Sequence, residues 1–194
     1  MHFQDKFTST RIGDIASVTK LAGFEYTEHI HYKTSGDIIM IRGLNCKGTR
    51  LVLDDIYWID KETSDLLPRS QLHKGDILMT YVGTVGEIAL IDENNKYHLA
   101  PNVAKITLTD QENNSPTFFS YLLYYMRDKI VNEMQSSALS MGKIRDIEVV
   151  IPDKTKQFAF EAFVNSLSDK RNSAEHTLTE LLNQRSAYID TEIA

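Results

Sequence analysis

Residues 74–91 read KGDILMTYVGTVGEIALI, an apolar run typical of β-strands that contains three glycines. The stretches on either side of Gly83 and Gly86, at 77–81 and 87–91, predict two strands. The glycine pair predicts a tight turn with unusual backbone angles, where another molecule approaches the main chain closely. A β-bulge that only curls the sheet explains the same glycines, and both explanations stay open.

Further short strands are expected on both sides of this stretch, up to residue 115. Their residues are mostly β-branched, aromatic or long aliphatic, and turn-forming residues separate them. They are predicted at 37–41, 50–59 and 103–108, the last with the alternation of a half-buried strand. Many short strands with mixed connections predict a curled, barrel-like sheet.

The apolar period changes at Ser115-Pro116, where the serine suits a helix N-cap and the proline suits the first helical position. Apolar residues then recur at helical spacing over 119–134, so this helix is expected to bury one face against the sheet. A small, polar loop at 136–142 and a short strand at 144–151 follow, and Pro152 ends the strand.

Residues 153–194 contain no glycine or proline and predict one long helix. Two sets of residues recur every seven positions, as the a and d positions of a coiled coil do. The a set is Val164, Arg171, Leu178 and Arg185, and the d set is Leu167, Ala174, Leu181 and Tyr188. This spacing favours packing against another chain, including a second copy, over a helix folded back on its own domain. The expected fold class is α+β: a curled mixed β-sheet domain with packed helices at 1–152, then a coiled-coil helix at 153–194.

Composition and charge narrow the class of protein. The chain has 194 residues, a net charge of −6 and a single cysteine, Cys46. One cysteine forms no intrachain disulfide and suits a reducing cytoplasm, and its simplest role is that of a small buried apolar side chain. The sequence has neither a secretory signal nor an apolar run long enough for a bilayer, so we expect a cytoplasmic protein without a membrane partner.

Charge is segregated along the chain, which weakens the argument that an acidic protein avoids DNA. Four basic residues between positions 33 and 50 share that window with one acid, Asp37. Such a cluster is either an ordinary solvated face or a local surface for an anionic partner.

The sequence contains no recognisable catalytic motif. A phosphate-binding loop, a G-x-S-x-G nucleophile elbow, a Glu-x-Lys metal-nuclease strand and an Asn/Asp-Pro-Pro-aromatic methylation motif are all missing. His29 and His31 would share one face of a strand, but two ligands do not make a zinc site. We therefore expect no enzyme activity and no metal or cofactor in this chain.

The order of these pieces resembles the target-recognition domain of type I restriction–modification specificity subunits. Residues 11–15 look like the family's first strand, and the glycine turn, the helix with 118–123 and the last strand follow in the family's order. Ile151-Pro152 and Gln157 are similar to the family's exit into a conserved helix, although Lys156 stands where a Glu-Gln pair is common. Full-length members carry two recognition domains and two long helices. This chain therefore resembles a half-length subunit, and both a natural half and a fragment fit.

The resemblance implies a non-catalytic subunit that reads one half of a bipartite double-stranded DNA target and docks methyltransferase (modification) subunits. It also implies that S-adenosylmethionine, ATP and Mg belong to partner subunits, with the restriction subunit as a further partner. Two copies would pair as a homodimer through their long helices. Two other functions stay open: a non-catalytic protein-binding adaptor that dimerises through its long helix, and a fragment of an enzyme whose catalytic domain lies elsewhere.

Side chains for DNA recognition are expected on loops and beside strand ends, where they reach base edges or phosphates. They carry hydrogen-bond donors or flank the glycine turn: Lys33, Arg42, Asn45, Lys47, Arg50, Tyr81, Thr84, Lys143 and Arg145. Among them arginine suits guanine and asparagine suits adenine.

Overall fold

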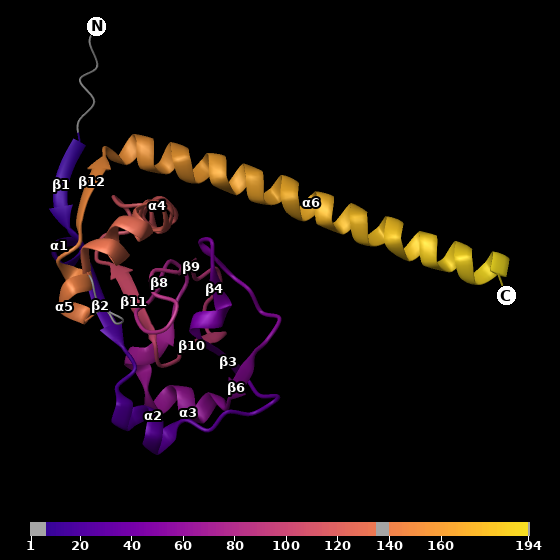
Figure 1. Cartoon of the computed structure of the whole chain (residues 1–194), viewed down its shortest axis with the longest axis horizontal. Helices are drawn as coiled ribbons and strands as arrows, with labels where there is room; N and C mark the ends of the chain where they lie inside the picture. Colours follow the sequence, from indigo (N-terminus) through magenta and orange to yellow (C-terminus); the bar gives the residue numbers. More distant parts are fainter. Residues whose placement is uncertain (1–6, 135–139, 194) are drawn as a thin grey trace, which may run out of the picture.

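Two four-stranded sheets hold most of the strands in this computed structural model, which describes residues 7–134 and 140–193 (Figure 1). The first sheet is antiparallel, and its strands in spatial order are β2 (Ala16–Lys20), β11 (Val103–Leu108), β8 (Ile77–Thr80) and β9 (Ile88–Leu90). The second sheet is mixed, because β3 and β10 run parallel, and its order is β6 (Tyr57–Ile59), β3 (Ile38–Ile41), β10 (Tyr97–Leu99) and β7 (Gln71–Leu72). The predicted α+β class is confirmed, with the strands divided between sheets.

Two smaller strand pairs complete the β structure. β1 (Phe7–Arg11) pairs antiparallel with β12 (Glu148–Pro152), which places the start of the described chain beside the strand that precedes the long helix. β4 (Cys46–Lys47) and β5 (Arg50–Leu51) form a hairpin, so the strand predicted at 50–59 is two separate strands, β5 and β6. Cys46 is buried, as predicted, and burial raises the pKa of its thiol to about 12.

Short helices interrupt the region where the sequence predicts strands alone. They are α1 (Ile12–Ile15), α2 (Gly23–His29), α3 (Lys61–Leu66) and the 3-10 turns η1 (Gly43–Asn45) and η2 (Pro68–Ser70). The strand predicted at 11–15 is wrong, because one helical turn there directs Ile12 into the core. The last strand starts later than predicted, since Ile144 lies in α5 (Met141–Arg145). Residues 135–139 of the predicted loop lie outside the described residues.

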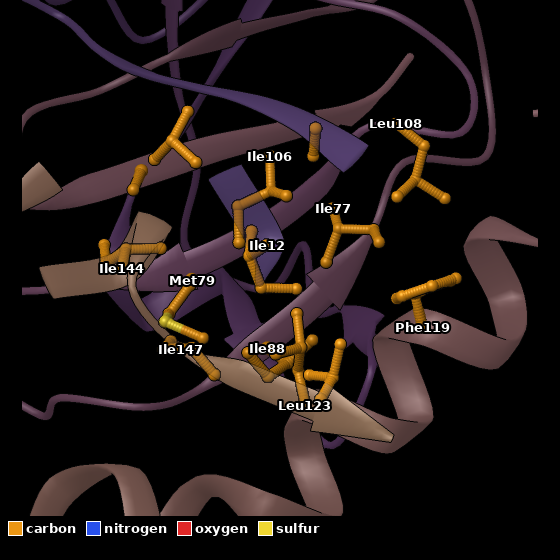
Figure 2. Close-up of a cluster of buried hydrophobic side chains, with 14 of the residues drawn as sticks. Ile12, Ile77, Met79, Ile88, Ile106, Leu108, Phe119, Leu123, Ile144 and Ile147 are labelled. Carbon is orange, nitrogen blue, oxygen red and sulfur yellow. The ribbon is translucent and has the colours of Figure 1, made fainter. Parts of the chain in front are cut away.

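Helix α4 (Pro116–Met134) packs its apolar face on the first sheet, as predicted. Ser115 caps it, because its hydroxyl accepts a hydrogen bond from the Phe118 amide at 3.0 Å. Phe119 and Leu123 of α4 join a buried cluster with isoleucines and a methionine from β8, β9 and α1 (Figure 2). This cluster is the core that supports the glycine turn, because β8 and β9 lead directly into it.

Strand β11 is buried on both faces, whereas its alternating pattern predicts a half-buried strand. One face meets the core under α4, and the other face turns toward the second sheet. Lys105 lies on that second side, where its ammonium donates to the Gln71 carbonyl at 2.9 Å. Burial lowers the pKa of Lys105. The alternation of β11 therefore separates two buried environments, not a core from water.

Helix α6 (Lys154–Ile193) confirms the long C-terminal helix and projects from the domain as a rod (Figure 1). Its 40 residues span about 60 Å at the α-helical rise. Val164 is 8% exposed and packs within its own chain, so its assignment to an intermolecular seam is wrong. Leu178 and Leu181, farther along, are 57% and 56% exposed. The alternative that α6 packs on its own domain thus holds only for the start of the helix.

None of the described helices combines the length and apolar content that crossing a bilayer requires.

A buried glutamine joins the start of α6 to the start of α4. Gln157 is 2% exposed, and its Oε1 accepts from the Ser115 amide at 3.1 Å while its Nε2 donates to the Pro152 carbonyl at 3.0 Å. Glu161, one turn farther on, accepts from the Ser115 hydroxyl at 2.6 Å. These hydrogen bonds fix the direction in which α6 leaves the domain.

Replacing this glutamine is expected to destabilise the domain. Gln157→Ala leaves a buried amide of Ser115 and a carbonyl of Pro152 without partners, which costs about 2 kcal/mol in the free energy of unfolding. Urea unfolding at fixed protein concentration measures the change. Thr155→Ala, at an exposed position on the same turn, is the matched control and should unfold like the wild type. An unchanged midpoint for Gln157→Ala would show that the junction does not depend on this side chain.

Candidate nucleic-acid interface

The chain between β8 and β9 forms the tight turn that the glycine pair predicts. Buried Thr80 holds this turn, because its hydroxyl donates to the Thr84 carbonyl and accepts from the Glu87 amide at 2.9 Å. Gly83 and Gly86 have φ angles of 83° and 88°, in the left-handed region that favours glycine.

The two glycines have different surroundings. A Cβ on Gly86 would lie 3.0 Å from Cγ2 of Val131, so Gly86 allows the turn to pack against α4. A Cβ on Gly83 would meet nothing within 4 Å, and this residue is exposed. Close approach of a ligand to the main chain therefore remains a prediction for Gly83 alone, and Gly86 has a packing role.

This difference predicts unequal effects of alanine at the two positions. Both Gly83→Ala and Gly86→Ala place a Cβ at positive φ, at a cost of about 1 kcal/mol in unfolding free energy. Gly86→Ala also pushes into Val131, and we expect a total of about 3 kcal/mol from strain and overpacking together. Denaturant unfolding of the two variants is the measurement. Equal midpoints would contradict the packing role of Gly86.

A groove of about 540 Å³ opens beside this turn. Its lining combines aromatic, apolar, polar and basic side chains from segments far apart in the sequence: Tyr26, Tyr32, Arg42, Gly43, Leu44, Thr80, Val82, Gly83, Thr84, Pro101 and Asn102. Of the predicted site residues, Arg42 and Thr84 line it. Tyr81 adjoins it, and its ring lies 5.7 Å from the Lys20 ammonium. The groove thus joins the basic window, residues 33–50, to the glycine turn, the β8–β9 connection with Gly83 and Gly86.

Arg42 is held in one position by its neighbours. The Cζ atom of its guanidinium lies 4.4 Å from the Tyr57 ring centroid, and Tyr57 stacks on Tyr32 at 5.1 Å. Nη2 of Arg42 donates to the carboxylate and to the carbonyl of Asp55, both at 2.9 Å. Burial raises the pKa of the Tyr32 hydroxyl. A guanidinium fixed in this way is suited to recognition that depends on geometry.

The structure does not place Asn45 for the base contact that the sequence predicts, because its side chain is buried. It is 1% exposed. Its Oδ1 accepts from the Arg42 amide at 3.0 Å, and its Nδ2 donates to the carbonyls of Val52 and Asp55 at 2.9 and 3.0 Å. With its hydrogen-bonding groups engaged inside the protein, Asn45 instead fixes the shape of η1.

Lys47 and Arg50 lie on the β4–β5 hairpin, where they stand directly opposite each other and are exposed. The hairpin is attached to β9, because the Thr49 amide donates to the Ile88 carbonyl at 3.0 Å. Like charges opposite each other destabilise a strand pair, and an anion between them would relieve the repulsion. Arg50 lines a separate hollow of about 370 Å³ beside α6, outside the groove.

The other predicted residues do not line the groove. Lys33 is exposed and pairs with Asp60. Lys143 and Arg145 lie on α5, which packs against β2, and Nη2 of Arg145 donates to the Val18 carbonyl at 2.8 Å. The structure therefore divides the predicted residues other than the buried Asn45 among four places: the groove, the hairpin, the surface of α5 and the position of Lys33 beside Asp60.

Several residues of the groove are missing from the sequence prediction. Tyr32 lines the groove and stacks on Tyr57, which contacts Arg42 from outside the lining. Leu44 and Val82 present exposed apolar side chains to the groove. Leu44 lies inside the basic window and Tyr32 directly precedes it. Their positions next to the predicted basic residues are the signal in the sequence that could have identified them. Asn102 is far from the basic window in the sequence, and only the folded structure brings it to the groove.

The structure also tests the two candidate metal ligands. His29 ends α2 and His31 follows that helix, so neither lies on the strand that the prediction requires. Within residues 7–134 and 140–193, no group of three or more histidine, cysteine, aspartate or glutamate side chains is placed to hold a metal ion.

Solved structures with the same fold come from type I restriction–modification systems. A chain from a study of complex assembly and conformational transition of the type I R-M system is 13% identical, with a TM-score of 0.61, and the match covers 90% of this chain and 41% of that chain. The HsdS subunit from Thermoanaerobacter tengcongensis is 12% identical, with a TM-score of 0.58 and coverage of 88% and 39%. The type I restriction–modification system S subunit from M. genitalium is 15% identical, with a TM-score of 0.58 and coverage of 88% and 41%. At these identities the likeness shows the fold.

The chain spans about two fifths of the length of these solved chains. A comparison with curated proteins found no match. The family model of the type I restriction modification DNA specificity domain matches residues 4–184, which include the β domain and most of α6. The chain therefore belongs to the family of type I restriction modification DNA specificity domains.

Proposed function

We propose that this chain reads one half of a bipartite double-stranded DNA target within a type I restriction–modification complex. Family membership supports DNA recognition, and the groove is the observation that carries the assignment of the reading surface. It combines the fixed guanidinium of Arg42, the open main chain at Gly83 and the exposed hydroxyl-bearing Thr84. Side chains and main chain that meet base edges specify sequence, whereas contacts to phosphates position the protein.

The hairpin is the proposed phosphate-contacting surface. Lys47 and Arg50 present two opposed positive charges, and a phosphate group between them would offset their repulsion. Lys143 on α5 adds a positive charge on another exposed surface. This division, with bases at the groove and phosphates at the hairpin, explains how a chain with a net charge of −6 binds DNA through local basic surfaces.

In this proposal the chain supplies recognition and no catalysis. Methyltransferase subunits would bind S-adenosylmethionine and dock along the helices, and restriction subunits would use ATP and Mg. The exposed apolar residues of α6 support a role in assembly, because Leu167, Leu178 and Tyr188 are 49%, 57% and 68% exposed in the single chain. We infer that two copies pair through this surface and that each copy reads one half of the target.

The first test is retention of random-sequence duplex DNA by the full chain, alone and with the methyltransferase subunits of a type I system. We expect the logarithm of the binding constant to fall linearly with the logarithm of salt concentration, with a slope of about −3 for three or four phosphate contacts. A protein-binding adaptor would retain no DNA at any salt concentration. That result would reject the proposed function in favour of the adaptor.

A further inference from the structure

We propose that Leu44 recognises thymine, through contact with the C5-methyl group in the major groove, so that the half-site contains an A·T pair opposite this residue. This inference rests on the proposed function and specifies which base the groove selects. The sequence prediction selects side chains with hydrogen-bond donors, and therefore does not include Leu44, because leucine carries no hydrogen-bonding group.

Leu44 is exposed on a turn that cannot easily move. It is the middle residue of η1, it is 63% exposed, and it lines the groove. The buried Asn45 side chain ties this turn to the backbone at Arg42, Val52 and Asp55. Three hydrogen bonds therefore hold the turn that presents the leucine.

Single exposed apolar residues are common, and the setting is what distinguishes Leu44. Val82, 37% exposed on the glycine turn, lines the same groove. Around these two side chains lie polar and charged groups, including the Arg42 guanidinium and the side chains of Thr84 and Asn102. The groove thus places a small apolar surface among hydrogen-bonding groups and the ion-paired guanidinium of Arg42.

This combination matches the major-groove edge of an A·T pair. Thymine presents a methyl group beside its O4 acceptor, and adenine presents N7 and an amino group, whereas an unmodified G·C pair presents no methyl group. Membership of the DNA specificity family favours a nucleic acid over an apolar peptide as the occupant. Leu44 therefore fits the methyl group, with Arg42 placed to approach an acceptor or a phosphate nearby.

The test compares thymine with deoxyuridine, which lacks only the C5-methyl group. The full chain, with methyltransferase subunits, selects its target from a random-sequence duplex library, and each thymine of the selected half-site is then replaced singly by deoxyuridine. We expect one replacement to weaken wild-type binding about fourfold, the loss expected for one buried methyl group. The same replacement should change the binding of Leu44→Ala less than twofold, because the contact is already lost, roughly as in a double-mutant cycle.

Leu66→Ala is the matched control, since Leu66 is 67% exposed on α3 and does not line the groove. This variant should show the wild-type response to deoxyuridine. A selected half-site without A·T pairs, no effect of any deoxyuridine, or an undiminished effect in Leu44→Ala would each overturn the thymine assignment while leaving DNA recognition intact. Failure to select any sequence would overturn both this inference and the proposed function.

Discussion

Replacing Leu178 and Leu181 together by aspartate is expected to abolish self-association through α6. These side chains lie at a and d positions of the same heptad and are 57% and 56% exposed in the single chain. A symmetric pair of helices would bury both leucines from each copy, and each burial contributes about 2 kcal/mol. The double replacement removes that contribution and places four carboxylates close together, so we expect the dimer dissociation constant to rise at least about 10⁴-fold.

Light scattering at several concentrations measures this effect, with a wild-type mass of twice 22.2 kDa and a variant mass of 22.2 kDa as the expected values. Thr179→Asp with Asn183→Asp adds the same charge at positions away from the a and d seam, and this control should remain dimeric. Val164 is left out because it packs within its own chain. A dimer that survives the leucine replacements, or a monomeric wild type, would contradict helix pairing.

Arg42→Ala is expected to weaken binding to the selected DNA target about 10- to 100-fold, the range for loss of one hydrogen bond from a charged group. The guanidinium is fixed by Asp55 and stacked on Tyr57, so its position is already determined in the free protein. Arg42→Lys keeps the charge but not the planar fork. We expect it to bind the target nearly as weakly as Arg42→Ala while keeping more of the affinity for random duplex DNA.

Quantitative binding titrations on selected and random duplexes separate these effects, and a urea unfolding curve checks that each variant is folded. Arg69→Ala is the control, since Arg69 is exposed on η2 and does not line the groove. Unchanged affinity of a folded Arg42→Ala variant for the selected target would remove Arg42 from the reading surface.

Local signals in the sequence predict the long elements well. Ser115 and Pro116 mark the start of α4 because an N-cap hydroxyl and a fixed proline φ both favour helix initiation. α1 is missed because its four residues are too few to show a helical period, and its isoleucines equally suit a strand. The length of α6 is predicted, but burial of Val164 is not, since a heptad pattern does not reveal which surface covers each turn.

The candidate site is harder to predict, because it is assembled from distant segments. Asn45 and Arg42 both look like base-reading residues, yet only the fold shows that the Asn45 amide is bonded to Val52 and Asp55. The pairing of Arg42 with Tyr57 likewise depends on how β3 and β6 lie side by side. Basic residues in one sequence window therefore end in different surroundings: Arg42 in the groove, Lys47 and Arg50 on the hairpin, and Lys33 beside Asp60.

The most direct test of half-site recognition by paired copies is the sequence that the wild-type chain selects, with methyltransferase subunits, from a random-sequence duplex library. The proposed pairing of two copies through α6, with a recognition domain in each copy, predicts an inverted repeat: two copies of one half-site separated by a gap of constant length and variable sequence. Such a target would support both the groove as a half-site reader and the helix pair as a spacer. Selection of a single unrepeated site would contradict the paired arrangement, and the absence of any selected sequence would contradict DNA reading by this chain.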